Sequence, residues 1–121
     1  MGSTAVQPYN DYPLYVAGKP VETGAWLEVK HKYSQELYAR VALADAKTLE
    51  QAIQAAAAAE AEMAALKPFQ KQSILLHCVQ RFKEIREELT NILIAEGGKP
   101  RKAAAAEVER LINTCQIAAD A

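Results

Sequence analysis

The sequence predicts an α+β segment in which a small antiparallel β element precedes about four helices. Up to about residue 43, short runs rich in aromatic and β-branched residues are separated by turn residues, which is typical of short strands. From Asp45 onward, apolar residues recur every three or four positions, and glycine or proline stands at the expected helix ends. The change of period near residue 45 therefore divides a β part from a helical part.

Three short strands are expected in the first part. They are Tyr12–Ala17, followed by a turn at Gly18-Lys19-Pro20, then Trp26–Tyr33 and Leu37–Leu43. Since only turns separate them, a hairpin or a small antiparallel sheet follows. Residues 1–11 are polar, and we expect them to form a flexible tail before a structured part at 12–121.

Four helices are expected in the second part. Asp45 is the predicted N-cap of a helix that ends near Leu66, and Pro68 opens the next. A short third helix is expected at about Glu87–Glu96, and the last runs from about Pro100 to the end. The residues that share a face in these helices are, in chain order, Leu49, Ile53, Ala57, Ala61 and Ala64; Leu75, Cys78, Phe82 and Ile85; Leu89, Ile92 and Leu93; and Ala104, Val108, Leu111, Ile112 and Cys115.

The segment Gly97-Gly98-Lys99 is predicted to join two helices rather than to cradle a phosphate. A phosphate loop has spaced glycines and a Lys-Ser or Lys-Thr pair after a strand. Here a helix precedes the glycines and Pro100 follows the lysine. A left-handed glycine that ends one helix, with a proline that starts the next, accounts for the pattern.

The composition of the chain argues against several classes of function. The formal net charge is −1 and basic residues are interspersed with acidic ones, which argues against nucleic-acid and membrane-surface partners. No apolar run approaches the length of a membrane span and the first residues lack a signal-peptide core, so we expect a cytoplasmic protein. We expect Cys78 and Cys115 to be buried free thiols rather than a disulfide. The spacing of these cysteines and of His31 and His77 is not that of a metal site, and it is not that of a nucleophile–base pair.

One polar group remains as a candidate site. Glu107, Arg110 and Thr114 lie on one stripe of the last predicted helix. The spacing alone favours a solvated face with an ordinary Glu–Arg pair. The alternative is a guanidinium that Glu107 holds in place to bind an anionic ligand, for which its planar fork is suited.

The order of motifs resembles the amino-terminal part of the aldehyde dehydrogenase superfamily. The segments that carry the resemblance are LYVAGKPVE, YARVALADAKTLEQAIQAAAAA, ILLHCVQRFKEIREELTNILIAEGGKP and AEVERL. One departure is the stretch His31–Glu36, where many members have an Asn-Pro-x-x-Gly turn. Together the segments cover about 14–121, and the sequence is closest to the glyceraldehyde-3-phosphate, lactaldehyde and phosphonoacetaldehyde dehydrogenase group.

The resemblance implies an α/β fold of which this segment is the first part of the cofactor-binding domain. It also implies NAD(P)-dependent oxidation of a small aldehyde by a homo-oligomeric parent enzyme. The family's catalytic and cofactor-binding residues lie beyond Ala121, so we expect this chain to bind neither NAD nor NADP and to be inactive without the remainder of the enzyme. In members that act on phosphorylated aldehydes, the arginine matching Arg110 holds the anionic end, with Glu107 as its expected support. A stand-alone alanine-rich helical interaction module is the alternative.

Overall fold

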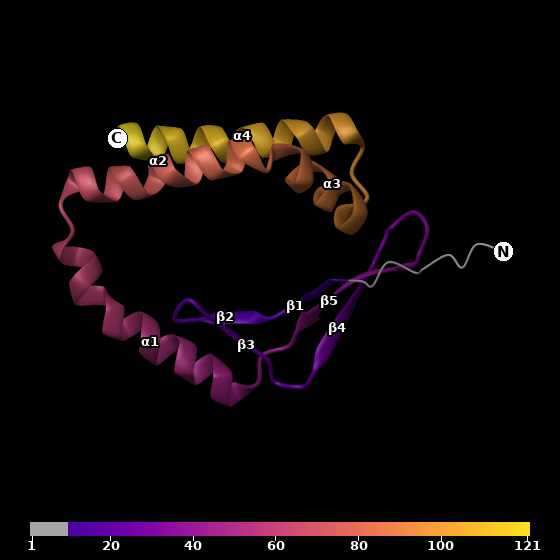
Figure 1. Cartoon of the computed structure of the whole chain (residues 1–121), viewed down its shortest axis with the longest axis horizontal. Coiled ribbons are helices and arrows are strands. Elements are labelled where there is room, and N and C mark those ends of the chain that lie inside the picture. The colour runs from indigo at the N-terminus through magenta and orange to yellow at the C-terminus, as the bar shows by residue number, and fades with distance from the viewer. Residues whose placement is uncertain (1–9) are drawn as a thin grey trace. The chain divides into compact units, whose positions relative to one another are not determined.

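The computed structural model describes residues 10–121 (Figure 1). The chain forms two compact units, residues 1–58 and 59–121, whose boundary lies within the first helix. The tail expected at 1–11 lies outside the described residues except at its end, where Asn10 and Asp11 belong to a strand. None of the helices in the described part is long and apolar enough to cross a membrane.

The first unit contains a three-stranded sheet of order β1-β5-β4 and a separate hairpin of β2 and β3. Pairing is antiparallel except between β1 and β5, which run parallel. The single strand expected at Tyr12–Ala17 is interrupted at Pro13, which has no N–H to donate, and its two halves join different sheets. The turn expected at Gly18-Lys19-Pro20 is shorter, because Lys19 and Pro20 belong to a strand that pairs with the second half. The strands are β1 (Asn10–Tyr12), β2 (Leu14–Val16), β3 (Lys19–Val21), β4 (Trp26–Lys30) and β5 (Leu37–Ala42).

Arg40 of β5 links all three strands of the larger sheet. It lies opposite Asp11 in the parallel register, and its Nε and Nη2 donate to the two carboxylate oxygens of Asp11 at 2.9 and 2.6 Å. On the other side its guanidinium lies 4.8 Å from the ring centroid of Trp26 on β4. A bidentate ion pair combined with a cation–π contact fixes the short strand β1 against the sheet.

Stability of this sheet should fall in acid. The hydrogen bond from Arg40 lowers the pKa of Asp11 below its ordinary value of 3.8. A carboxyl with a lower pKa in the folded state contributes stability above its unfolded pKa, and that contribution is lost as the pH falls through the folded pKa. Urea unfolding at neutral pH and at about pH 3 should show a smaller acid loss for Asp11→Asn than for the unmodified protein. An equal loss in both would contradict this role of the pair.

The turn between β4 and β5 has a histidine cap. The strand expected to reach Tyr33 ends at Lys30, and the Nδ1 of His31 accepts the N–H groups of Tyr33 and Ser34 at 3.1 and 3.3 Å. Gln35 closes the turn in the left-handed region, with φ of 62°. His31 and Gln35 thus stand where the Asn-Pro-x-x-Gly turn would place its capping asparagine and its glycine.

Gln35→Gly should stabilise the protein. A residue with a Cβ is strained at this φ by roughly 1–2 kcal/mol, and glycine relieves the strain while adding up to about 1 kcal/mol of unfolded-state entropy. The net expected gain is about 0.5–1 kcal/mol in the free energy of unfolding, measured from the urea midpoint. The neighbouring Glu36→Gly is a control that should destabilise, because Glu36 is not among the residues of positive φ.

The four helices follow the sequence closely. Asp45 caps the first as expected, because its carboxylate accepts the Thr48 N–H at 2.7 Å, and this hydrogen bond network lowers its pKa. Gly98 takes the left-handed conformation, with φ of 66°, and its N–H donates to the carbonyl of Ile94 at 3.0 Å, which confirms the helix joint. The helices are α1 (Ala46–Ala65), α2 (Pro68–Glu84), α3 (Arg86–Gly97) and α4 (Arg101–Asp120).

The core of the second unit lies where α4 packs against α2 and α3. Val79, Val108 and Ile112 form its centre, and partly buried neighbours surround them: Phe82, Leu89, Leu93 and Cys115. Val79 was absent from the predicted faces, and Leu111 was wrongly placed inward, since it is 39% exposed. The expected thiol burial is only partial, because Cys78 and Cys115, both free, have intermediate exposure.

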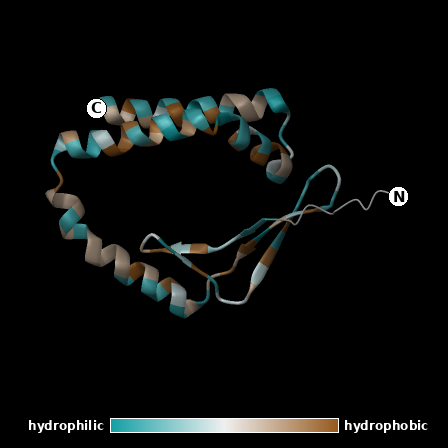
Figure 2. Cartoon of the chain, viewed as in Figure 1, coloured by the Kyte–Doolittle hydropathy of each residue, from teal (hydrophilic) through white to brown (hydrophobic). Residues whose placement is uncertain are grey.

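The predicted stripe on α1 is exposed in this chain. Leu49 and Ile53 are 57% and 55% accessible, and the helix consists mainly of alanine, visible as its pale brown-grey colour in Figure 2. Alanine burial contributes little free energy compared with leucine. A helix of this composition therefore derives little stability from the described residues of this chain.

Candidate functional site

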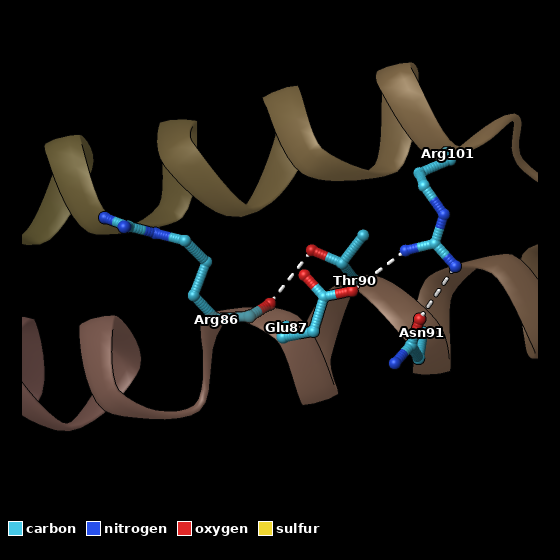
Figure 3. A network of polar contacts seen from close by, with 5 residues as sticks. All are labelled: Arg86, Glu87, Thr90, Asn91 and Arg101. Atoms are coloured by element: carbon cyan, nitrogen blue, oxygen red, sulfur yellow. Dashed lines mark hydrogen bonds and ion pairs between the residues drawn. The ribbon is translucent and has the colours of Figure 1, made fainter.

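The candidate residues Glu107 and Arg110 lie on α4, whose first turn is anchored to α3. Arg101 donates from Nη1 to the carboxylate of Glu87 at 3.0 Å and from Nη2 to the side-chain oxygen of Asn91 at 3.1 Å (Figure 3). Behind this contact, the hydroxyl of Thr90 donates to the Arg86 carbonyl at 2.9 Å within α3. The joint at Gly98 and the Arg101 contacts together set the direction in which α4 carries its side chains.

Glu107 is paired with Lys99 rather than with Arg110. The Lys99 ammonium, from the joint, forms an ion pair with a carboxylate oxygen of Glu107. Among residues 10–121, the ion pairs of the structure include none between Glu107 and Arg110. The support that we expected Glu107 to give Arg110 is therefore not seen, because the joint places a lysine within reach of the same carboxylate.

Glu107 and Arg110 also face different hollows of the surface. Glu107 lines an apolar hollow between α3 and α4, together with Leu89, Ile92, Leu93, Val108 and Leu111. Arg110 lines a polar depression of about 420 Å³ between α2 and α4, together with Lys83, Glu109, Ile112, Asn113 and Gln116. The two side chains that we predicted to act as a pair therefore line two different depressions.

Among residues 10–121, Arg110 differs from the other arginines in having no ion-pair partner. The chain has five arginines. Four form ion pairs in the structure: Arg40 with Asp11, Arg81 with Glu84, Arg86 with Glu109 and Arg101 with Glu87. Within the described part of the chain, no hydrogen bond or ion pair of Arg110 is found. An exposed guanidinium that no carboxylate neutralises is available to an anion.

The acid beside Arg110 is already neutralised. Glu109 lines the same depression, but its carboxylate accepts from the Nε of Arg86 at 2.6 Å. Lys83 lies at the α2 side of the depression and, over residues 10–121, takes part in no ion pair of the structure. Of the residues that the structure describes, two cations without an ion-pair partner and one carboxylate that Arg86 neutralises line the depression, so its electrostatic potential favours an anion.

The described residues offer little support for a catalytic histidine or a metal site. The side chains of His31 and His77 lie on different units, His31 as a turn cap and His77 exposed on α2. Over residues 10–121, no three His, Cys, Asp or Glu side chains are grouped so that they could hold a metal ion. Sequence reasoning missed Lys83, because its proximity to Arg110 depends on how α2 packs against α4.

Comparison with known proteins identifies the class to which this fold belongs. The family model described as "Aldehyde dehydrogenase family" matches residues 19–121. This match covers most of the chain, and the chain therefore belongs to the aldehyde dehydrogenase family. The α+β arrangement of strands and helices described above matches part of that fold.

Two curated relatives illustrate the similarity. A 3-sulfolactaldehyde dehydrogenase of Priestia aryabhattai is 30% identical over 117 residues, which are 97% of this chain and 24% of the relative. A lactaldehyde dehydrogenase of Methanocaldococcus jannaschii is 33% identical over 101 residues, 79% of this chain and 22% of the relative. The chain thus spans about a quarter of the length of the curated relatives it matches.

Solved structures agree in fold. Aldehyde dehydrogenase 21 from Physcomitrella patens, solved with the reaction product succinate, superposes with a TM-score of 0.90 at 38% identity, over 93% of this chain and 24% of that one. The lactaldehyde dehydrogenase of Escherichia coli gives a TM-score of 0.87 at 25% identity, with coverage of 93% and 24%. The arrangement of strands and helices is therefore that of an aldehyde dehydrogenase over its matched quarter.

Proposed function

We propose that this chain is the amino-terminal part of an NAD- or NADP-dependent aldehyde dehydrogenase that oxidises a small anionic aldehyde to the acid. In this proposal Arg110 binds the anionic end of the substrate. The chain supplies no catalytic residue and is inactive without the rest of the enzyme.

The observation that carries the proposal is that Arg110, at the border of the depression between α2 and α4, has no ion pair with any residue that the structure describes. The other four arginines each have a carboxylate partner in the structure. A guanidinium without such a partner, beside a hollow that a second cation lines, can donate two hydrogen bonds to the oxygens of a carboxylate, sulfonate or phosphate.

The matched proteins support an anionic substrate. One relative is named for an aldehyde that carries a sulfonate, and one similar structure contains succinate, which has two carboxylates. Two others are named for lactaldehyde, which is uncharged, so the resemblance alone leaves the charge of the substrate open. The electropositive depression is what favours the anionic class for this chain.

The cofactor would be held elsewhere in the enzyme. The similar structures include one with NAD and one with NAP. Over residues 10–121 the chain has no glycine-rich turn from a strand into a helix, since Gly97 and Gly98 lie between two helices. The remainder of the enzyme would therefore bind the phosphates of NAD or NADP, the cofactor that accepts the hydride. The homo-oligomeric state and cytoplasmic location stay predictions.

The proposal is tested by substrate comparison in the longer protein. The specificity constant for 3-sulfolactaldehyde or succinic semialdehyde should exceed that for butanal by at least tenfold, with NAD or NADP as oxidant, because about 1.5–3 kcal/mol of charged hydrogen bonding is gained. This chain alone should oxidise none of the three. A longer protein that prefers butanal would contradict the anionic class, and turnover by the isolated chain would contradict its inactivity.

A further inference from the structure

The depression that contains Arg110 has a second cation that the proposed function does not require. Lys83 lies in the last turn of α2, four residues after the core residue Val79, and Ile112 of the same core lies at the depression. Because the packing of Val79 against α4 fixes α2 there, the stem of Lys83 starts from an ordered position. Lys83 therefore lines the same hollow as Arg110.

The carboxylates near Lys83 are engaged with other groups. Glu84, its neighbour in sequence, pairs with Arg81 and accepts from the amide of Gln80 at 3.2 Å. Glu109, on the facing helix, pairs with Arg86 at 2.6 Å. Gln116 directs its amide to the carboxylate of Asp120 at 3.1 Å. In the described part of the chain, Lys83 is thus left with its charge uncompensated by an ion pair.

A guanidinium and an ammonium together can bind all three oxygens of a sulfonate or phosphate group. A planar carboxylate offers two oxygens, and the fork of one guanidinium satisfies both. A sulfonate or a phosphate ester offers three oxygens directed around a cone, so one oxygen remains after the guanidinium has bound two. An ammonium, which is a compact charge with three donors, can bind that third oxygen.

We infer that Lys83 is a specificity-determining residue that, with Arg110, makes the depression select a tetrahedral oxyanion, a sulfonate or phosphate, over a carboxylate. The inference rests on the proposed function, because it assigns a second group to the same substrate site. Arg110 supplies affinity for any anionic end, and Lys83 supplies the preference among anions.

The test uses the longer holoenzyme and three aldehydes, 3-sulfolactaldehyde, succinic semialdehyde and butanal. Lys83→Met should raise the KM for 3-sulfolactaldehyde about tenfold, and change the KM for the other two less than about twofold. Lys83→Arg should keep most of the preference, since the charge remains. Lys71→Met is the matched control, an exposed cation of α2 outside the depression, and should change none of the three.

A second measurement does not depend on turnover of the charged substrates. Inorganic sulfate should compete with 3-sulfolactaldehyde, and Lys83→Met should weaken this inhibition about tenfold while leaving inhibition by acetate unchanged. If Lys83→Met leaves the sulfonate preference intact in an enzyme that does favour anionic aldehydes, the role of Lys83 is overturned and the proposed function stands. If the unmodified enzyme shows no preference for anionic aldehydes, both are overturned.

Discussion

Arg110→Met in the longer enzyme should lower kcat/KM for an anionic aldehyde by about 10- to 150-fold, because a charge-assisted hydrogen-bonded contact contributes about 1.5–3 kcal/mol. For butanal the change should stay below about twofold, since that substrate has no anionic end. The loss should appear chiefly in KM, because the anionic end lies away from the reacting carbon and is bound alike in the ground state and the transition state. Steady-state kinetics with both substrates measure the contrast.

Two variants separate the geometry of the guanidinium from its charge. Arg110→Lys keeps the charge but loses the bidentate fork, so it should recover only part of the lost kcat/KM. Lys102→Met removes an exposed cation from the same helix, outside the depression, and should leave both substrates unaffected. Equal losses for the anionic aldehyde and for butanal in Arg110→Met would mean that Arg110 acts on the fold or on the common catalytic steps instead.

The local parts of the fold could be predicted because their causes lie within a few residues. The Asp45 cap, the left-handed Gly98 and the change of period near residue 45 each depend on side chains or φ angles within one turn of chain. The strand at Tyr12–Ala17 was predicted as one piece, because the parallel pairing of β1 with β5 joins residues about thirty positions apart. Pro13 marks the break between the two halves, but no residue near it indicates which strand each half pairs with.

The candidate site could be predicted only in part for the same reason. Arg110 follows from the Glu-Val-x-Arg pattern on a helix, and its position on α4 was predicted correctly. Its support by Glu107 was not found, since Lys99 lies eight positions before Glu107 and becomes its partner only through the bend at Gly98. Lys83 reaches the depression through the packing of two helices, and helical periodicity within one helix carries no information on that contact.

Ile112→Ala should unfold the helical unit more readily than any surface change on the same helix. Ile112 is 5% exposed, and in the described part of the chain the other central members of its core are Val79 and Val108. Truncating a buried isoleucine costs roughly 2–5 kcal/mol through lost burial and the cavity left behind. Since the core contains few large side chains, this is a large fraction of a typical domain's stability of about 5–15 kcal/mol. Urea unfolding followed by circular dichroism at the helix band measures the loss.

Ile117→Ala is the matched control, because it removes the same atoms from the same helix at a position that is 62% exposed. In this chain it should change the free energy of unfolding by no more than about 0.5 kcal/mol. Ile112→Val should lower the free energy of unfolding by about 0.5–1.5 kcal/mol, a loss between those of the two alanine variants. If the two alanine variants lose equal stability, α4 does not present Val108 and Ile112 to α2, and Arg110 and Lys83 would then not border one depression. The stability series therefore tests the packing on which the assignment of the anion site depends, independently of any substrate.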